Sequence, residues 1–143
     1  MKKQLVKLAV HVAIQLIVES ATMADLLQTK LIPALIRVES SGNDKAIGDR
    51  HIKERAYGCL QIRKPCIDDV NRAYGTRYRP EDALGNRSLS IEICQKYIKM
   101  YATERRLGRT VTLEDMARIW NGGPSGWRRD ATNAYWKKVQ KRL

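Results

Sequence analysis

Apolar residues recur at spacings of three and four in several stretches of the chain, which is the pattern of helices with one buried face. In the first stretch, residues 25–41, the recurring positions are Leu31, Ile32, Leu35, Ile36 and Val38. Pro33 suits the first turn of this helix, where its missing N–H costs nothing. Asp25 or Thr29 is available as N-cap, and Gly42 is placed to end the helix in a left-handed conformation.

Further helices are predicted at about 68–74, 88–106, 113–120 and 130–141. The longest carries a stripe that faces a core, formed by Leu89, Ile93, Cys94, Tyr97, Ile98 and Tyr101. Thr112 and Asp115 are spaced as a capping box. Residues 42–62 are charged and punctuated by glycine, which predicts coil with a small hairpin. The pattern therefore predicts a mainly α fold, a single helical domain with a short coil or β-hairpin segment after the first helix.

The beginning of the chain has the pattern of an export signal. Lys2, Lys3 and Lys7 precede an apolar run at 8–18, which is too short to cross a bilayer as a helix. Small residues follow, and Ala24 is the preferred last residue of the signal. This interpretation gives a signal peptide at 1–24 and a mature domain at 25–143 without a transmembrane anchor. The alternative is that the same residues form an amphipathic first helix of the domain.

Length and charge narrow the class of protein. A chain of 143 residues suits one domain with a single core, and we expect a monomer. Its net charge is +12, and +10 would remain after loss of residues 1–24, which hold three lysines and one glutamate. Such a charge favours a polyanionic partner. Lysine and arginine are scattered through every predicted helix rather than gathered on one face, so nucleic acid is not the expected partner.

One glutamate stands where a catalytic acid would be expected. Glu39 comes one position after Val38, close to the apolar face of the first helix. A carboxyl group at the rim of an apolar surface is poorly solvated, which disfavours its charged form and raises its pKa. A general acid that works near neutral pH requires such a pKa. Taken alone, Glu39 is also compatible with an ordinary solvated residue in a last helical turn.

Three short segments follow one another along the chain and favour the interpretation of Glu39 as a catalytic acid. They are Glu39-Ser40-Ser41-Gly42-Asn43, Ala56-Tyr57-Gly58-Cys59-Leu60-Gln61-Ile62 and Ile119-Trp120-Asn121-Gly122-Gly123-Pro124. Their order and spacing resemble the soluble-lytic-transglycosylase (SLT) domain of the lysozyme-like superfamily, whose members cleave the glycan strands of peptidoglycan. Tyr135, before Lys138-Val139, completes the resemblance, which covers residues 28–140. Cys59-Leu60 stands where the family has Leu-Met, and Trp120 replaces a motif tyrosine.

The resemblance implies a lysozyme-like α+β fold and a set of site residues. It makes Glu39 the catalytic residue, acting first as acid and then as base while the muramic 6-hydroxyl attacks the anomeric carbon. The candidate substrate-binding residues are Ser40, Tyr57, Gln61, Trp120, Asn121 and Tyr135. Gln61 offers a donor and an acceptor for an N-acetyl or hydroxyl group. Ser40 and Asn121 are equally compatible with helix-end roles, and Trp120 and Tyr135 with core packing.

The three cysteines, Cys59, Cys66 and Cys94, are accompanied by no CxxC pair or histidine cluster, so neither a metal nor another cofactor is expected. Export predicts one disulfide and one buried thiol. Because Cys59 lies in a motif that is apolar in the family, Cys66–Cys94 is the expected pair.

The resemblance, taken with the export signal, implies an exported lytic transglycosylase that acts on the MurNAc–GlcNAc bond, in the periplasm, outside the cell or as a phage lysin. Ordinary hydrolytic glycosidases pair two carboxyl groups. Asp44 and Asp49 follow Glu39 in the coil, so a hydrolysing lysozyme with one of them as base is the first alternative. The second is a basic module that binds glycan or nucleic acid without catalysis.

Overall fold

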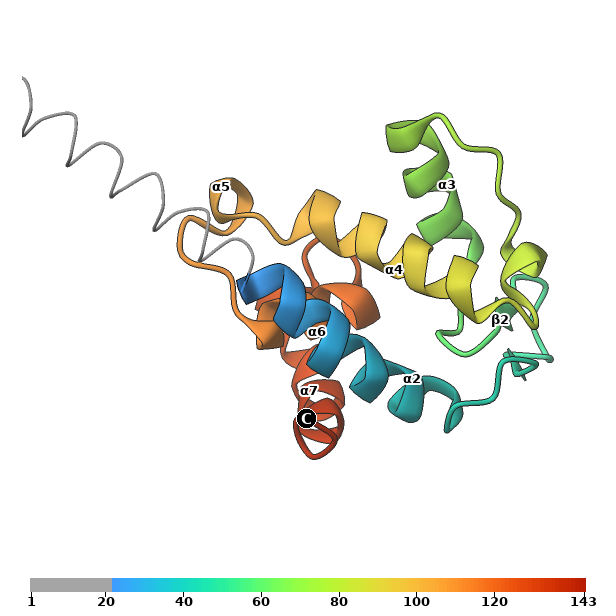
Figure 1. Ribbon diagram of the computed structural model, residues 1–143, viewed down its shortest axis with the longest axis horizontal. Coiled ribbons are helices and arrows are strands. Elements are labelled where there is room, and N and C mark those ends of the chain that lie inside the picture. The colour runs from blue at the N-terminus through green and yellow to red at the C-terminus, as the bar shows by residue number, and fades with distance from the viewer. Residues whose placement is uncertain (1–21) are drawn as a thin grey trace, which may run out of the picture.

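The structure, a computed structural model, describes residues 22–143 (Figure 1). Its helices and strands are α2 (Ile32–Ser40), β1 (Ile47–Gly48), β2 (Ala56–Tyr57), α3 (Lys64–Tyr74), α4 (Arg87–Tyr101), α5 (Glu104–Leu107), α6 (Leu113–Gly122) and α7 (Asn133–Gln140). α4 packs against α3 and α6, and α7 packs against α2 and α6. The mainly helical fold predicted from the sequence is confirmed, as is the small hairpin after the first helix.

The first helix begins earlier than its predicted cap. Residues 22–26 are already helical, and a π-helical turn, Leu27–Leu31, joins them to α2. Neither Asp25 nor Thr29 caps a helix start, and the hydroxyl of Thr29 donates to the backbone oxygen of Asp25 at 2.8 Å. The π turn ends two residues before Pro33, whose missing N–H interrupts the regular α-helical ladder inside a continuous helix. The predicted signal segment lies almost wholly outside the described residues.

The end of α2 is close to its predicted form. Ser41 is the residue with left-handed backbone, at φ 55°, and Gly42 follows at φ 86°. The N–H groups of both residues donate to carbonyls of the last turn of α2. The chain therefore leaves the helix one residue earlier than the glycine predicted, and Glu39 falls in the last helical turn.

The long helix predicted at 88–106 is divided in two. α4 ends at Tyr101, and Thr103 begins α5 because its side chain accepts a hydrogen bond from the backbone N–H of Arg106. Threonine favours such caps over helix interiors. The apolar stripe of α4 lies in the core as expected, with Ile93, Cys94, Tyr97 and Ile98 buried.

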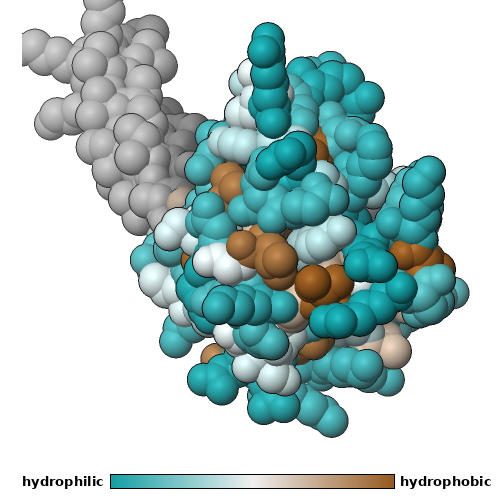
Figure 2. Space-filling model, turned by 90° about the vertical axis from the view of Figure 1, so that its right-hand side faces the viewer, coloured by the Kyte–Doolittle hydropathy of each residue, from teal (hydrophilic) through white to brown (hydrophobic). Residues whose placement is uncertain are grey.

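Residues 42–62 form the hairpin end of the molecule. β1 and β2 pair antiparallel, with Ile47 opposite Tyr57. This end is turned towards the viewer in Figure 2, where hydrophilic residues cover most of the face and hydrophobic ones form small separate spots. Ile52, 45% exposed, is among the few large apolar side chains exposed in the described part of the chain.

Two further results concern membrane spans and the cysteines. Among residues 22–143, no helix is long and apolar enough to cross a membrane. Cys59, Cys66 and Cys94 are all free thiols, so the expected Cys66–Cys94 disulfide is wrong. Cys94 is buried in the stripe of α4, and Cys66 lines a pocket.

Candidate active site

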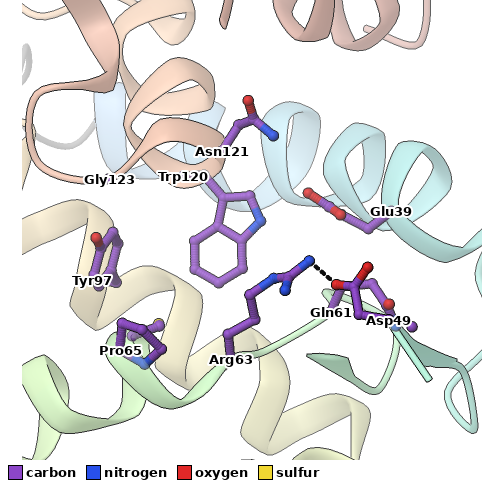
Figure 3. A pocket seen from close by; sticks show the side chains of 11 residues that line it. Glu39, Asp49, Gln61, Arg63, Pro65, Tyr97, Trp120, Asn121 and Gly123 are labelled. Carbon is purple, nitrogen blue, oxygen red and sulfur yellow. Dashed lines mark ion pairs between the residues drawn. The ribbon is translucent and has the colours of Figure 1, made fainter. Parts of the chain in front are cut away.

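Glu39 lies at the edge of a pocket of about 360 Å³ (Figure 3). The residues that line this pocket are Glu39, Gly48, Asp49, Gln61, Arg63, Pro65, Cys66, Tyr97, Trp120, Asn121 and Gly123. They come from the end of α2, the hairpin, the start of α3, the middle of α4 and the end of α6. Segments far apart in the sequence thus meet around one carboxyl group.

Tyr135 fixes the side chain of Glu39. It projects from α7, which packs against α2, and its hydroxyl donates to Oε1 of Glu39 at 2.6 Å. Burial raises the pKa of Glu39, and the hydrogen bonds from Tyr135 and Trp120 and the positive charge of Arg63 oppose this rise only in part. The same burial, with the charge of Glu39, raises the pKa of Tyr135, so its hydroxyl stays a donor. The raised pKa of Glu39 expected from the sequence is confirmed in direction.

Trp120 forms one wall of the pocket. Its ring packs edge-on against Tyr97, with 5.8 Å between the ring centroids and an interplanar angle of 86°. Asn121, the next residue, also lines the pocket and is exposed. Both side chains are presented at the C-terminal end of α6. Aromatic faces and amide groups can contact sugars, and both of these predicted binding residues line the pocket.

Gln61 lines the pocket from the other side in a strained conformation. Its φ is 53°, and its Nε2 donates to the carbonyl of Gly58 at 2.9 Å. Gly48 lies directly against its Oε1, where an added Cβ would collide. Of the three non-glycine residues with positive φ in the described part of the chain, Gln61 and Asp49 line the pocket. Backbone strain of this kind concentrates at functional sites.

Three predicted binding residues, Ser40, Tyr57 and Tyr135, do not line the pocket, and Tyr135 is connected to it through its hydrogen bond to Glu39. The hydroxyl of Ser40 donates to the backbone oxygen of Cys59 at 2.8 Å and also contacts that of Ile36. Ser40 therefore ties α2 to the loop that carries Gln61. Tyr57 belongs to β2 and forms an isolated bridge with Ile62. Ser40 and Tyr57 therefore hold the backbone next to the pocket and do not form part of its lining.

The two aspartates proposed as a second carboxylate are separated by the structure. Asp44 lies outside the pocket, and its Oδ1 is 3.0 Å from Nε of Arg87. Asp49 lies in the pocket with Glu39, and its Oδ2 forms an ion pair with Nη2 of Arg63. Asp49 is thus the carboxylate that shares the pocket with Glu39.

Sequence reasoning missed several residues of the pocket. Arg63, Pro65 and Cys66 follow directly after the Gln61 motif and begin α3. Tyr97 was assigned to the core, and it is 6% exposed, yet it also borders the pocket. For Arg63 the available signal was its place two residues after Gln61 in the sequence.

Comparisons with known proteins agree with this geometry. The family model of the transglycosylase SLT domain matches residues 17–143. The chain therefore belongs to the transglycosylase SLT domain family, and it is an enzyme of the lysozyme-like glycosidase class.

Among individual relatives, the chain is 31% identical to an invertebrate-type lysozyme of Ruditapes philippinarum over 113 residues, which is 78% of this chain and 79% of that protein. It is 42% identical to Lysozyme 1 of Crassostrea virginica over 55 residues, or 38% of this chain, and that match spans only 29% of the oyster protein. Its fold matches the crystal structure of Tapes japonica lysozyme with a TM-score of 0.66 at 26% identity, covering 79% of this chain and 88% of that one. Meretrix lusoria lysozyme, in complex with Aeromonas hydrophila PliI, matches with a TM-score of 0.64 at 24% identity and the same coverage.

Proposed function

We propose that the protein is a peptidoglycan lytic transglycosylase that cleaves the MurNAc–GlcNAc β-1,4 bond and leaves 1,6-anhydroMurNAc ends. The observation that supports this proposal is the environment of Glu39. Its carboxyl group is half-buried, is held by Tyr135 at 2.6 Å and has a raised pKa. Such a group is protonated at a pH where an ordinary glutamate is charged, as a general acid must be.

In the proposed reaction, Glu39 gives its proton to the glycosidic oxygen as the bond from that oxygen to C1 of the muramic sugar breaks. The GlcNAc side leaves as a hydroxyl, and positive charge develops on the muramic ring. The 6-hydroxyl of the same sugar then attacks C1, and its proton passes to the Glu39 carboxylate. Glu39 ends the cycle protonated, and no water is consumed.

Hydrolysis by a muramidase is the second candidate, because Asp49 lines the same pocket. A hydrolase needs this carboxylate either to take a proton from water or to attack the sugar. The ion pair of Asp49 with Arg63 already engages Oδ2. This engagement favours the reaction that needs no second carboxylate.

Mass spectrometry of the products from purified peptidoglycan distinguishes the two reactions. Transglycosylase action yields anhydro ends that are one water lighter than hydrolysed ends. Exclusive release of reducing ends, together with loss of activity in Asp49→Asn, would establish the muramidase. A binding module without catalysis would release no fragments, and it would not need a carboxyl group with a raised pKa at position 39.

We further propose export of the enzyme to the periplasm or the cell exterior, where its substrate lies. The basic and apolar residues of 1–24 support this proposal. N-terminal sequencing of active protein should begin near Asp25, and an intact Met1 terminus on cytoplasmic active protein would contradict export. The monomeric state stays a prediction, which light scattering on the purified protein would test.

A further inference from the structure

Arg63 is the only cation among the residues that line the pocket of Glu39 in the described part of the chain. It lies two residues after Gln61, in extended backbone directly before α3. Its side chain is 48% exposed, so solvent and substrate can reach it. Figure 3 shows the guanidinium pointing into the pocket beside the carboxyl groups of Glu39 and Asp49.

The ion pair with Asp49 engages only part of the Arg63 guanidinium. A guanidinium carries five N–H donors, and the ion pair with Asp49 engages Nη2 alone. Within residues 22–143, Nε and Nη1 of Arg63 have no hydrogen-bond partner in the protein. Asp49 therefore steadies the side chain in the pocket and leaves part of its fork open to a second acceptor. Arginine forms its strongest contacts with carboxylates and phosphates.

From this arrangement we propose that Arg63 is a specificity-determining residue, which binds a carboxylate carried by the glycan. The inference rests on the proposed function, because the muramic sugar at the scissile bond carries a lactyl group on O3. In strands without stem peptides this group ends in a free carboxylate, and where a peptide is attached it ends in a neutral amide. A charge-assisted hydrogen bond to the carboxylate is about twice as strong as a neutral one. Arg63 thus makes the enzyme prefer strands from which the peptides have been removed.

The test compares two substrates that differ by one charge per muramic sugar. Glycan strands are freed of stem peptides with an amidase, and half of them are coupled to methylamine so that each lactyl carboxylate becomes an N-methylamide. Total bonds cleaved give kcat/KM for each. We expect the wild-type value to be roughly tenfold or more higher on the carboxylate strands, the usual size of a hydrogen bond to a charged group. In Arg63→Gln this ratio should fall to within about twofold of one.

The overall positive charge of the protein would also favour anionic strands, so a matched control is needed. Lys64→Gln removes the same charge from the adjacent residue, which is exposed, pairs with Asp68 and lies outside the pocket. It should keep the full ratio, and the ratio should persist in salt, which screens exposed long-range charges most. Arg63→Lys should keep part of the ratio, because an ammonium retains the charge without the fork.

Two results would overturn the inference: a wild-type ratio near one, or an Arg63→Gln ratio equal to that of Lys64→Gln. The ratio counts all cleaved bonds, so it does not depend on whether the new ends are anhydro or reducing. Absence of any cleavage would refute the proposed function instead. In that case the dissociation constants of the two strand preparations for the Glu39→Gln protein still test the role of Arg63.

Discussion

Two carboxyl groups lie at opposite ends of two helices and have opposite environments. Asp115 is in the first turn of α6 and is 2% exposed. It accepts two hydrogen bonds of 2.7 Å from Arg109 and further bonds from Thr112. Burial disfavours its charge, but these bonds outweigh burial and lower its pKa. The positive end of the helix dipole adds to the stabilisation of its charge.

Glu39 is in the last turn of α2, where the helix dipole disfavours a negative charge. Burial dominates there, because a single hydrogen bond of 2.6 Å from Tyr135, a bond from Trp120 and the charge of Arg63 do not compensate it. One carboxyl group is therefore kept ionised and holds the fold together, whereas the other is kept able to carry a proton. The difference lies in the number of donors and in the end of the helix, rather than in burial itself.

The largest expected effect is the loss of activity in Glu39→Gln. Glutamine keeps the shape of the side chain and still accepts the Tyr135 hydrogen bond, but it cannot supply a proton. General acid–base catalysis contributes about 10²–10⁴-fold, and one residue is proposed to serve both steps. We expect release of soluble fragments from peptidoglycan to fall to background while circular dichroism stays that of the wild type. If Glu39→Gln clears cell wall as fast as the wild type, the site is assigned wrongly.

Asp115→Ala should lower the stability of the fold and leave the activity of the folded protein unchanged. It removes the capping box of α6 and leaves Arg109 without its partner, and breaking such a pair costs about 2–4 kcal/mol of unfolding free energy. Urea unfolding at neutral pH measures this loss, while activity per folded molecule should be close to that of the wild type. Glu114→Gln, at the neighbouring position, whose side chain is 41% exposed, is the control and should cost about 0.5 kcal/mol or less. A similar loss in both variants would mean that the Asp115 network does not hold the fold.

A smaller effect is expected for Tyr135→Phe, which removes the direct hydrogen bond to Glu39. That bond lowers the pKa of Glu39, so its loss should raise this pKa further. The limb of the pH–rate profile that reports Glu39 should move to higher pH, and kcat should fall by roughly tenfold, as for loss of one hydrogen bond to a charged group. The control is Tyr101→Phe, because the hydroxyl of Tyr101 donates to Asp69, outside the pocket. This variant should change neither the pH–rate limb nor kcat. An unmoved limb in Tyr135→Phe would show that Tyr135 only fills space.

Only some of the contacts that set the environments of Asp115 and Glu39 were predictable from the sequence. The capping box of Thr112 and Asp115 was readable because both partners lie within one helical turn, and the structure confirms it. The raised pKa of Glu39 was readable from the adjacent apolar face. The Arg109–Asp115 pair and the Tyr135–Glu39 bond were not, since they depend on where a loop and a distant helix pack.

The same distinction explains the errors in the fold and the site. Ser40 was assigned to the substrate from a motif, but its hydroxyl bonds the backbone of Cys59, nineteen residues away. Arg63 was overlooked because its role depends on a contact with Asp49 across the hairpin. The division between α4 and α5 turned on one threonine cap inside an otherwise continuous apolar stripe. Local signals predicted elements and single caps, whereas contacts between elements decided which side chains form the pocket.

The smallest expected effect concerns the unfolding free energy as a function of pH. The contributions of Asp115 and Glu39 to it should change in opposite directions as pH rises. Asp115 has a lowered pKa, so its contribution is present above its unfolded pKa and is lost as pH falls through its folded pKa. Glu39 has a raised pKa, so the folded state binds its proton more tightly than the unfolded chain does. The stability that this proton gives is present below the unfolded pKa of Glu39 and is lost as pH rises through the folded pKa.

The matched pair Glu39→Gln and Asp115→Asn therefore separates the two environments. Glutamine resembles protonated glutamate, so Glu39→Gln should equal the wild type at acid pH and exceed its unfolding free energy at neutral pH, by on the order of 1 kcal/mol, as is common when a strained functional group is removed. Asp115→Asn should lose more stability at neutral pH than at acid pH, because only the charged form engages Arg109 fully. Urea unfolding of both variants and of the wild type at a series of pH values measures the two curves. Parallel curves for the two variants would mean that the folded protein treats these carboxyl groups alike, and that Glu39 is not held in a proton-retaining site.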